Sequence, residues 1–214
     1  IIFYQYINMD TYTTEMNRNR VLADYESAVS RNREAFERGD VKVSSEYIYP
    51  NQVSDAANIT DIFYKNHIHV ISVIKRTKVG MDGLMIEILK NMTTHHDDKF
   101  VLEPQNVFIL TGMSNIIWES DMKERIPTCF RDNVFHHGKL HRLKPILFGI
   151  KNALIIIDEI DNGDKAEQKL HLLLKESGLL DIQYIKNNNI RFIFVSATMV
   201  REIRHLHKLG NIHH

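Results

Sequence analysis

Short apolar runs alternate with amphipathic stretches along most of the chain. The runs are rich in β-branched and aromatic residues, which is typical of buried strands, and the intervening stretches repeat apolar residues at helical spacing. Strands are expected at residues 69–75, 106–111, 133–137 (short), 152–158 and 190–198, helices at 51–65, 82–92, 115–124, 165–178 and 199–210, and polar loops at 91–98 and 186–190. This alternation predicts an α/β domain with a mainly parallel sheet and helices on both faces.

A mostly polar stretch precedes this alternation. Its apolar residues recur at helical spacing over residues 13–38. They are Val21, Leu22, Tyr25, Val29 and Phe36. The spacing favours a surface helix with one buried stripe over a partner-binding helix. Residues 1–47 are therefore expected to form an N-terminal helical extension, and residues 48–210 the α/β domain.

The helix expected at residues 51–65 opens that domain. Its apolar residues fall on one predicted face, and they are Val53, Ala56, Ile59, Ile62 and Phe63. We expect this face to pack against the sheet layer.

Composition restricts the classes of function. The 214 residues have room for one large domain with a small appendage. Lys+Arg and Asp+Glu both number 27, so any nucleic-acid surface must be a local patch. The single cysteine, Cys129, excludes an intramolecular disulfide and a multi-cysteine zinc site, and it favours a reducing, intracellular location. No apolar run approaches the ~18 residues that cross a bilayer, so no membrane partner is expected.

Three of the predicted strands end in short polar clusters. They are "KRTKVGMDG" (75–83), "IDEID" (157–161) and "SAT" (196–198). Ligands of parallel sheets bind at the carboxyl ends of the strands. A strand–loop–helix turn directs backbone N–H groups at phosphate oxygens. In such a site Asp158 is suited to hold Mg²⁺ and Glu159 to polarise an attacking water.

The order of these clusters resembles motifs I, II and III of the superfamily 2 helicases. Gly80 falls in motif I, residues 158–161 ("DEID") in motif II and residues 196–198 in motif III. The segment "NVFILTGMSNIIWESDMKERIP" (106–127) resembles a variant of the motif Ia region, as found in helicase-like proteins of large DNA viruses. The resemblance covers about residues 48–205.

The resemblance implies the first RecA-like domain of a P-loop NTPase that acts on DNA or RNA. Its ligands would be ATP and Mg²⁺, and its partners nucleic acid and a second RecA-like domain or another protein. Because no second RecA-like domain fits in this chain, a fragment of a longer protein is expected, with a single-domain relative as the alternative. A viral origin would place it in the host cytoplasm, in a virus factory, or in the virion.

The resemblance also assigns roles to individual residues. Gln52 corresponds to a glutamine that reads adenine. The loop that would hold phosphate contains Thr77, Lys78, Val79, Gly80, Met81 and Asp82. Asp158 would bind the metal, and Glu159 would act in catalysis. Contacts to nucleic acid, or coupling to it, are implied for Thr111, Ser114, Ser196 and Thr198, with Lys123 and Arg125 as further backbone contacts.

Motif I departs from the family pattern at the two positions that contact the phosphates and Mg²⁺. The family has Lys, which reaches the β- and γ-phosphates, followed by Thr or Ser, which binds Mg²⁺. Here these positions hold Met81 and Asp82, and Lys75 and Lys78 are the candidate substitutes within the loop. An alternative function is therefore a degenerate, non-hydrolysing P-loop domain that serves as a structural or interaction module, for example in a virion.

The cysteine, the histidines and the tryptophan do not form recognisable catalytic or metal-binding motifs. Cys129 has no CxxC partner, which indicates an incidental thiol rather than a nucleophile. The histidines lack the spacing of a metal site. Trp118 is expected to pack the helix at residues 115–124 onto the sheet, with a stacking platform for nucleic-acid bases as the alternative.

Overall fold

The centre of the molecule is a five-stranded sheet in which every neighbouring pair is parallel. The computed structural model describes residues 9–39, 48–65, 68–74, 81–95, 102–160 and 168–196. The strands are β1 (Val70–Ile74), β2 (Val107–Thr111), β3 (Val134–Phe135), β4 (Ala153–Asp158) and β5 (Ile190–Ser196). Their order is β1-β5-β4-β2-β3. The α/β fold with a parallel sheet is therefore confirmed, and its architecture is consistent with a RecA-like domain.

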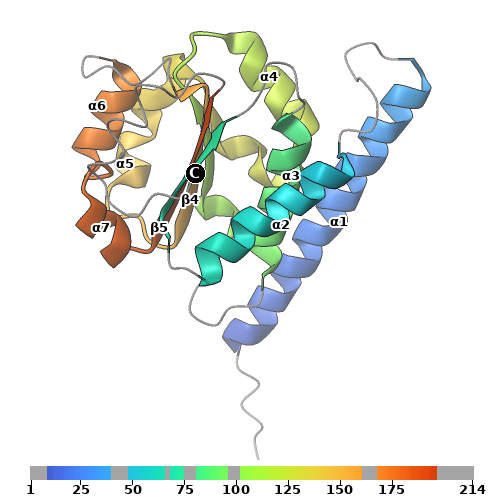
Figure 1. The fold of residues 1–214 in the computed structure, drawn as a ribbon, viewed down its shortest axis with the longest axis horizontal. Coiled ribbons are helices and arrows are strands. Elements are labelled where there is room, and N and C mark those ends of the chain that lie inside the picture. Colours follow the sequence, from blue (N-terminus) through green and yellow to red (C-terminus); the bar gives the residue numbers. More distant parts are fainter. Residues whose placement is uncertain are drawn as a thin grey trace, which may run out of the picture.

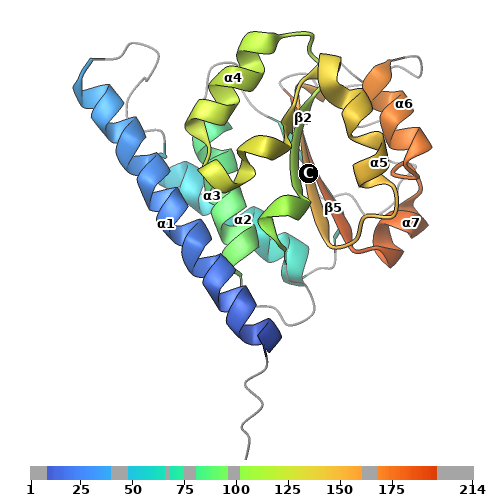
Figure 2. The same cartoon turned by 180° about the vertical axis from the view of Figure 1, so that it is seen from behind.

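Helices flank both faces of this sheet (Figures 1 and 2). The α-helices are α1 (Met9–Glu37), α2 (Pro50–Lys65), α3 (Met81–Thr94), α4 (Ile116–Arg125), α5 (Lys144–Leu147), α6 (Lys169–Glu176) and α7 (Ile182–Asn187). In the described ranges the 3₁₀ helices η1 (Pro104–Asn106), η2 (Thr128–Asn133) and η3 (His137–Arg142) connect them. In both views α1–α4 lie on one side of the sheet and α5–α7 on the other.

The apolar core has two halves, one on each face of the sheet. Successive side chains of a strand point to opposite faces. In β4, Leu154 and Ile156 therefore join the half under α1–α4, whereas Ile155 and Ile157 join the half under α5–α7. All four side chains are fully buried. This two-sided burial explains why the strand reads as a continuous apolar run.

The strand order places a topological switch point at the carboxyl edge of the sheet, between β2 and β4, and this position is called the crevice here. Strands β2 and β4 are neighbours, yet β2 is followed by α4 on one face and β4 by α6 on the other. Connections that leave adjacent strands toward opposite faces separate there, and ligands of open α/β sheets bind at that position. The right-handedness of parallel crossovers assigns each helix to its face.

The N-terminal extension packs on the domain as one long helix. Helix α1 lies on the outer side of α2 and α3 (Figure 1). Val21 and Ala28 are buried, and Tyr25 packs against the core half under α1–α4. Of the predicted stripe, Val21 is buried and Tyr25 and Val29 are half-buried, whereas Leu22 is exposed.

Most predicted element boundaries agree with the structure, with a few corrections. Helix α3 continues to Thr94 and α7 to Asn187, into segments that were predicted as loops. Val53 was expected on the buried face of α2 but is exposed, whereas Gln52 beside it is buried. The predicted helix at residues 199–210 lies outside the described residues.

Candidate functional site

Four strand ends meet at the carboxyl edge of the sheet. Thr111 of β2 is the register partner of Asp158 of β4, and Asp158 is also the partner of Val195 of β5. On the far side of β5, Ile74 of β1 pairs with Ser196. The strands that lead into the segments predicted to carry phosphate, metal and coupling chemistry therefore end at one edge of the sheet.

Asp158 is the best-defined carboxylate of this edge. It is only 5% exposed. Its Oδ1 accepts a hydrogen bond from the backbone N–H of Glu159 at 3.1 Å, and its Oδ2 accepts one from the indole Nε1–H of Trp118, also at 3.1 Å. A backbone donor and a side chain 40 residues away thus orient the carboxylate.

The sequence before α4 explains how Trp118 reaches Asp158. Asn115 is the N-cap, and its side chain accepts hydrogen bonds from the backbone N–H groups of Ile117 and Trp118. An Asn at this position fixes where a helix begins. Because α4 begins directly beyond the end of β2, its first turn lies beside the neighbouring strand end, where Asp158 is. The predicted packing of Trp118 is thus extended by a polar contact.

Glu159 has an unusual backbone conformation. Its φ is +50°, in the left-handed region. Among the described residues, the other non-glycine residues with positive φ are Asn152 and Asn189, and asparagine tolerates this region. Glutamate has no such preference for the left-handed region, so this conformation strains the backbone. Backbone strain of this kind clusters at functional sites. The half-buried Glu159 directly follows the most strongly oriented carboxylate of the edge.

The residues predicted to touch nucleic acid differ in their accessibility. Thr111 is fully buried, and its Oγ1 accepts a hydrogen bond from the backbone N–H of Met113 at 3.2 Å, so it shapes the turn after β2. Ser114 is exposed. Ser196 is fully buried, and strand alternation directs it to the face opposite Asp158. Thr198 lies outside the described residues.

The predicted phosphate loop lies mainly outside the described part of the chain. Thr77, Lys78, Val79 and Gly80, like Lys75, are among residues 75–80, which the structure does not describe.

Met81 is the first residue of α3, and Asp82 lies in the first turn. The Asp82 carboxylate forms an ion pair with Arg125 at the end of α4. Arg125 was a candidate nucleic-acid contact, and this pair gives it a structural partner.

A buried charged network next to the crevice was missed at the sequence level. Glu119 is 4% exposed and accepts hydrogen bonds from Lys123 at 2.7 Å and Lys139 at 2.6 Å. The backbone N–H of His136 lies 3.4 Å from its other oxygen. Burial acts to raise the pKa of Glu119, but the two lysines outweigh it, so this pKa is lowered. The spacing of four residues between Glu119 and Lys123 could have predicted their ion pair on one helix. The contact of Lys139, which comes from η3, had no signal in the sequence.

Gln52 has a structural role at the start of α2. Its Oε1 accepts a hydrogen bond from the backbone N–H of Tyr49 at 2.7 Å, and Pro50 begins the helix. A glutamine at the third helical position that reaches back to the N-cap is half of a capping box. The adenine contact stays a prediction, and in the structure the carbonyl oxygen of this side chain already accepts a hydrogen bond.

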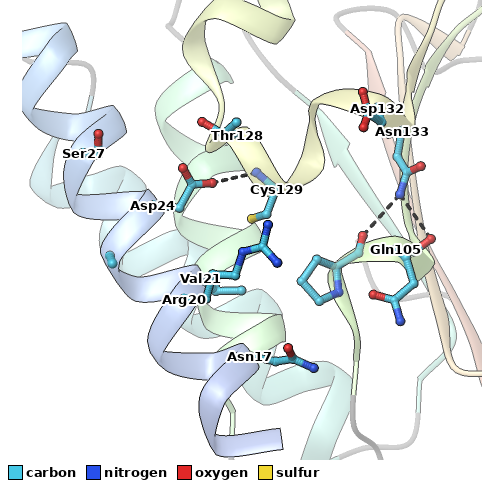
Figure 3. Close-up of a pocket in the computed structure, with 12 residues that line it drawn as sticks. Asn17, Arg20, Val21, Asp24, Ser27, Gln105, Thr128, Cys129, Asp132 and Asn133 are labelled. Carbon is cyan, nitrogen blue, oxygen red and sulfur yellow. Dashed lines mark hydrogen bonds between the residues drawn. The ribbon is translucent and has the colours of Figure 1, made fainter. Parts of the chain in front are cut away.

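A polar cavity of about 720 Å³ lies away from this edge, between α1, η1 and η2 (Figure 3). Because η1 and η2 precede β2 and β3, it lies toward the amino ends of the strands. Asp24 accepts a hydrogen bond from the backbone N–H of Cys129 at 2.7 Å. Burial and this carboxylate raise the pKa of Cys129 to about 12, which fits the prediction of an unreactive thiol.

The described ranges lack two further classes of feature, a metal-binding cluster and a membrane-spanning helix. These residues hold no cluster of three or more His, Cys, Asp or Glu side chains suited to a metal ion. None of the helices in the same ranges is long and apolar enough to span a membrane.

No protein-family model matches the chain, and no curated protein matches it in sequence at a significant level. Function is therefore inferred from the fold and from the geometry of the carboxyl edge.

Proposed function

We propose that this chain binds Mg²⁺ and ATP at the carboxyl edge of its sheet, as the first RecA-like domain of a helicase-type NTPase that acts on DNA or RNA. One observation carries the proposal: Asp158 and Glu159 end a fully buried central strand at the crevice between β2 and β4. A strained glutamate beside an oriented, buried carboxylate is the arrangement expected of a functional site.

The oxygens of Asp158 fit a Mg²⁺ site. Each accepts a hydrogen bond in the structure, and these contacts fix the orientation of a buried carboxylate at the end of β4. Mg²⁺ usually binds through one or two carboxylates together with waters and substrate phosphates. The ion, when bound, would offset the negative charge of the phosphates. Asp158 would hold it, and Glu159 would orient a water.

The same edge offers a surface for nucleic acid and for a second domain. Ser114 is exposed beside the crevice, so a backbone contact at Ser114 is compatible with a nucleotide bound at Asp158. Ile116 and Ile117 are 74% and 67% exposed on the first turn of α4. Exposed apolar side chains of this kind are consistent with a partner surface, and a second RecA-like domain is the partner we propose.

The proposal is tested by calorimetry with ATP and Mg²⁺. We expect binding to wild-type protein and a loss of Mg²⁺-dependent affinity in Asp158→Asn. Turnover, measured with and without single-stranded DNA or RNA, should fall by about 10²-fold or more in Glu159→Gln, in which binding is kept. Absence of nucleotide binding to the wild-type chain would refute the proposal.

A second candidate is a P-loop-like module that does not hydrolyse ATP. The pair formed by Asp82 and Arg125 favours it, because it places a carboxylate in the first turn of α3, beside Met81. Because Arg125 already engages this carboxylate, Asp82 does not replace the Thr or Ser hydroxyl that binds Mg²⁺ in the family pattern. The double substitution Met81→Lys and Asp82→Thr restores the family pattern. Turnover that appears only in this variant would support the second candidate, whereas turnover in the wild type would exclude it.

A further inference from the structure

The contact between α4 and the carboxyl end of β4 has a specific donor. Trp118 Nε1–H donates to Asp158 Oδ2 at 3.1 Å, and the indole is otherwise packed against the core half under α1–α4. Its donor therefore lies at the crevice while its ring is held by apolar neighbours. A tryptophan has one polar atom, a donor, so this contact occupies all of its hydrogen-bonding capacity.

The other oxygen of the carboxylate is fixed in an independent way. Oδ1 accepts from the N–H of Glu159, the residue with φ of +50°. The two donors together limit rotation of a side chain that is 5% exposed. Outer donors of this type orient a metal-binding carboxylate, and their removal typically lowers metal affinity by about 10- to 100-fold.

We propose that Trp118 is the positioning residue of the metal site, and that its indole N–H sets the orientation in which Asp158 meets Mg²⁺. The role of Trp118 rests on the proposed function, because that function identifies the ion as Mg²⁺. It goes beyond the proposed function because it assigns a role to a residue of α4. Because the chain contains a single tryptophan, all tryptophan emission comes from Trp118.

The first experiment tests the contact without any ligand. Asp158→Asn replaces one charged oxygen by an amide group next to the indole N–H. We expect the emission of Trp118 to change in wavelength or intensity relative to wild type. Ile117→Ala, on the same turn but exposed, is the matched control and should leave emission unchanged. Identical emission of wild type and Asp158→Asn would overturn the proposal.

The second experiment follows binding by fluorescence and calorimetry in parallel, with Mg²⁺ and ATP added to wild-type protein. We expect both signals to change, and EDTA to reverse the fluorescence change. Trp118→Phe keeps an aromatic ring but removes the donor. Its Mg²⁺-dependent affinity, measured by calorimetry, should fall by roughly tenfold. A loss of less than twofold in a folded Trp118→Phe protein would overturn the proposal.

The combined outcomes separate the two proposals. Heat of binding without any change in Trp118 emission would overturn the role of Trp118 and leave the proposed function standing. Neither heat nor fluorescence change would overturn both. If Trp118→Phe does not fold, the comparison of wild type with Asp158→Asn still tests the contact, and the emission response of wild type to Mg²⁺ and ATP still tests the role of Trp118.

Discussion

At the scale of single residues, the candidate site combines a carboxylate that the sequence could identify with contacts that it could not. Asp158 and Glu159 end a strongly apolar run, so their place at a strand end follows from local pattern. Trp118 lies 40 positions away in the chain, and its contact with Asp158 depends on where α4 begins relative to β4. The positive φ of Glu159 had no sequence signal, since glutamate is not a residue that prefers this region.

The strain at Glu159 predicts a trade-off between stability and function. Glu159→Gly and Glu159→Ala both remove the carboxylate, and they differ only in the Cβ atom. Because the left-handed conformation costs L-residues roughly 1–2 kcal/mol, we expect the Gly variant to be more stable than the Ala variant by about 1 kcal/mol. Urea unfolding measures the difference. An Ala variant as stable as the Gly variant would show that residue 159 relaxes without strain.

The thiol of Cys129 is predicted to be slow to react in the folded protein. Burial first, and the Asp24 carboxylate second, raise its pKa to about 12 from an ordinary value of 9.0. At pH 8 the thiolate fraction then falls from about one in ten to about one in ten thousand. Labelling with iodoacetamide should be about 10³-fold slower than in urea-unfolded chain.

Asp24→Asn removes the carboxylate and should speed this labelling. The raised pKa has a consequence for stability as well. The folded state binds the thiol proton more tightly than the unfolded state, so the stabilisation is complete below pH 9 and is lost as pH rises toward 12. Labelling as fast in the folded as in the unfolded protein would contradict the burial of this thiol.

At the scale of elements, the long helices and the strands were predictable and the short helices were not. Strands of five to seven residues and helices of ten or more show a full hydrophobic period. Helices α5 and α7 have four and six residues, which is less than two turns, so they carry no measurable period. Tertiary packing places them instead, through Leu147 and Ile185, which are buried against the sheet.

Helix α1 is attached to α3 by a buried polar cluster. Glu87 of α3 is 1% exposed and accepts hydrogen bonds from the Tyr25 hydroxyl and, at 2.6 Å, from Lys90. Lys90 Nζ also lies 4.6 Å from the centre of the Tyr25 ring. Burial and the Glu87 carboxylate raise the pKa of Tyr25, so its hydroxyl remains a donor at neutral pH. The cluster makes the N-terminal extension part of the folded core.

Removing one member of this cluster should destabilise the protein. Tyr25→Phe deletes a donor to a buried carboxylate, so we expect the free energy of unfolding to fall by about 1–3 kcal/mol. Lys65→Ala is the control, because its pair with Asp61 is exposed and should contribute less than ~1 kcal/mol. The combined variant Tyr25→Phe with Glu87→Met should recover part of the loss, since it removes the buried charge as well. Equal effects of Tyr25→Phe and Lys65→Ala in urea unfolding would contradict this account.

At the scale of the whole molecule, the strand order decides where a ligand can bind. The alternation of elements predicted a mainly parallel sheet, but it could not predict which strands are neighbours, because pairing depends on contacts between distant segments. The observed order puts β4 between β5 and β2, and the connections after β4 and β2 leave on opposite faces. The crevice therefore lies at Asp158 and Thr111, whereas the polar cavity under α1 lies toward the other edge.

Hydrogen exchange distinguishes these two locations in solution. With Mg²⁺ and a non-hydrolysable ATP analogue, we expect slower exchange in peptides that cover residues 111–118 and 156–160, because a bound ligand restricts opening of the segments it contacts. Peptides that cover residues 128–133, which line the polar cavity, should exchange at an unchanged rate. Asp158→Asn should abolish the protection at the carboxyl edge. Protection confined to residues 128–133 would place the ligand in the polar cavity instead, and it would show that the crevice does not determine binding in this fold.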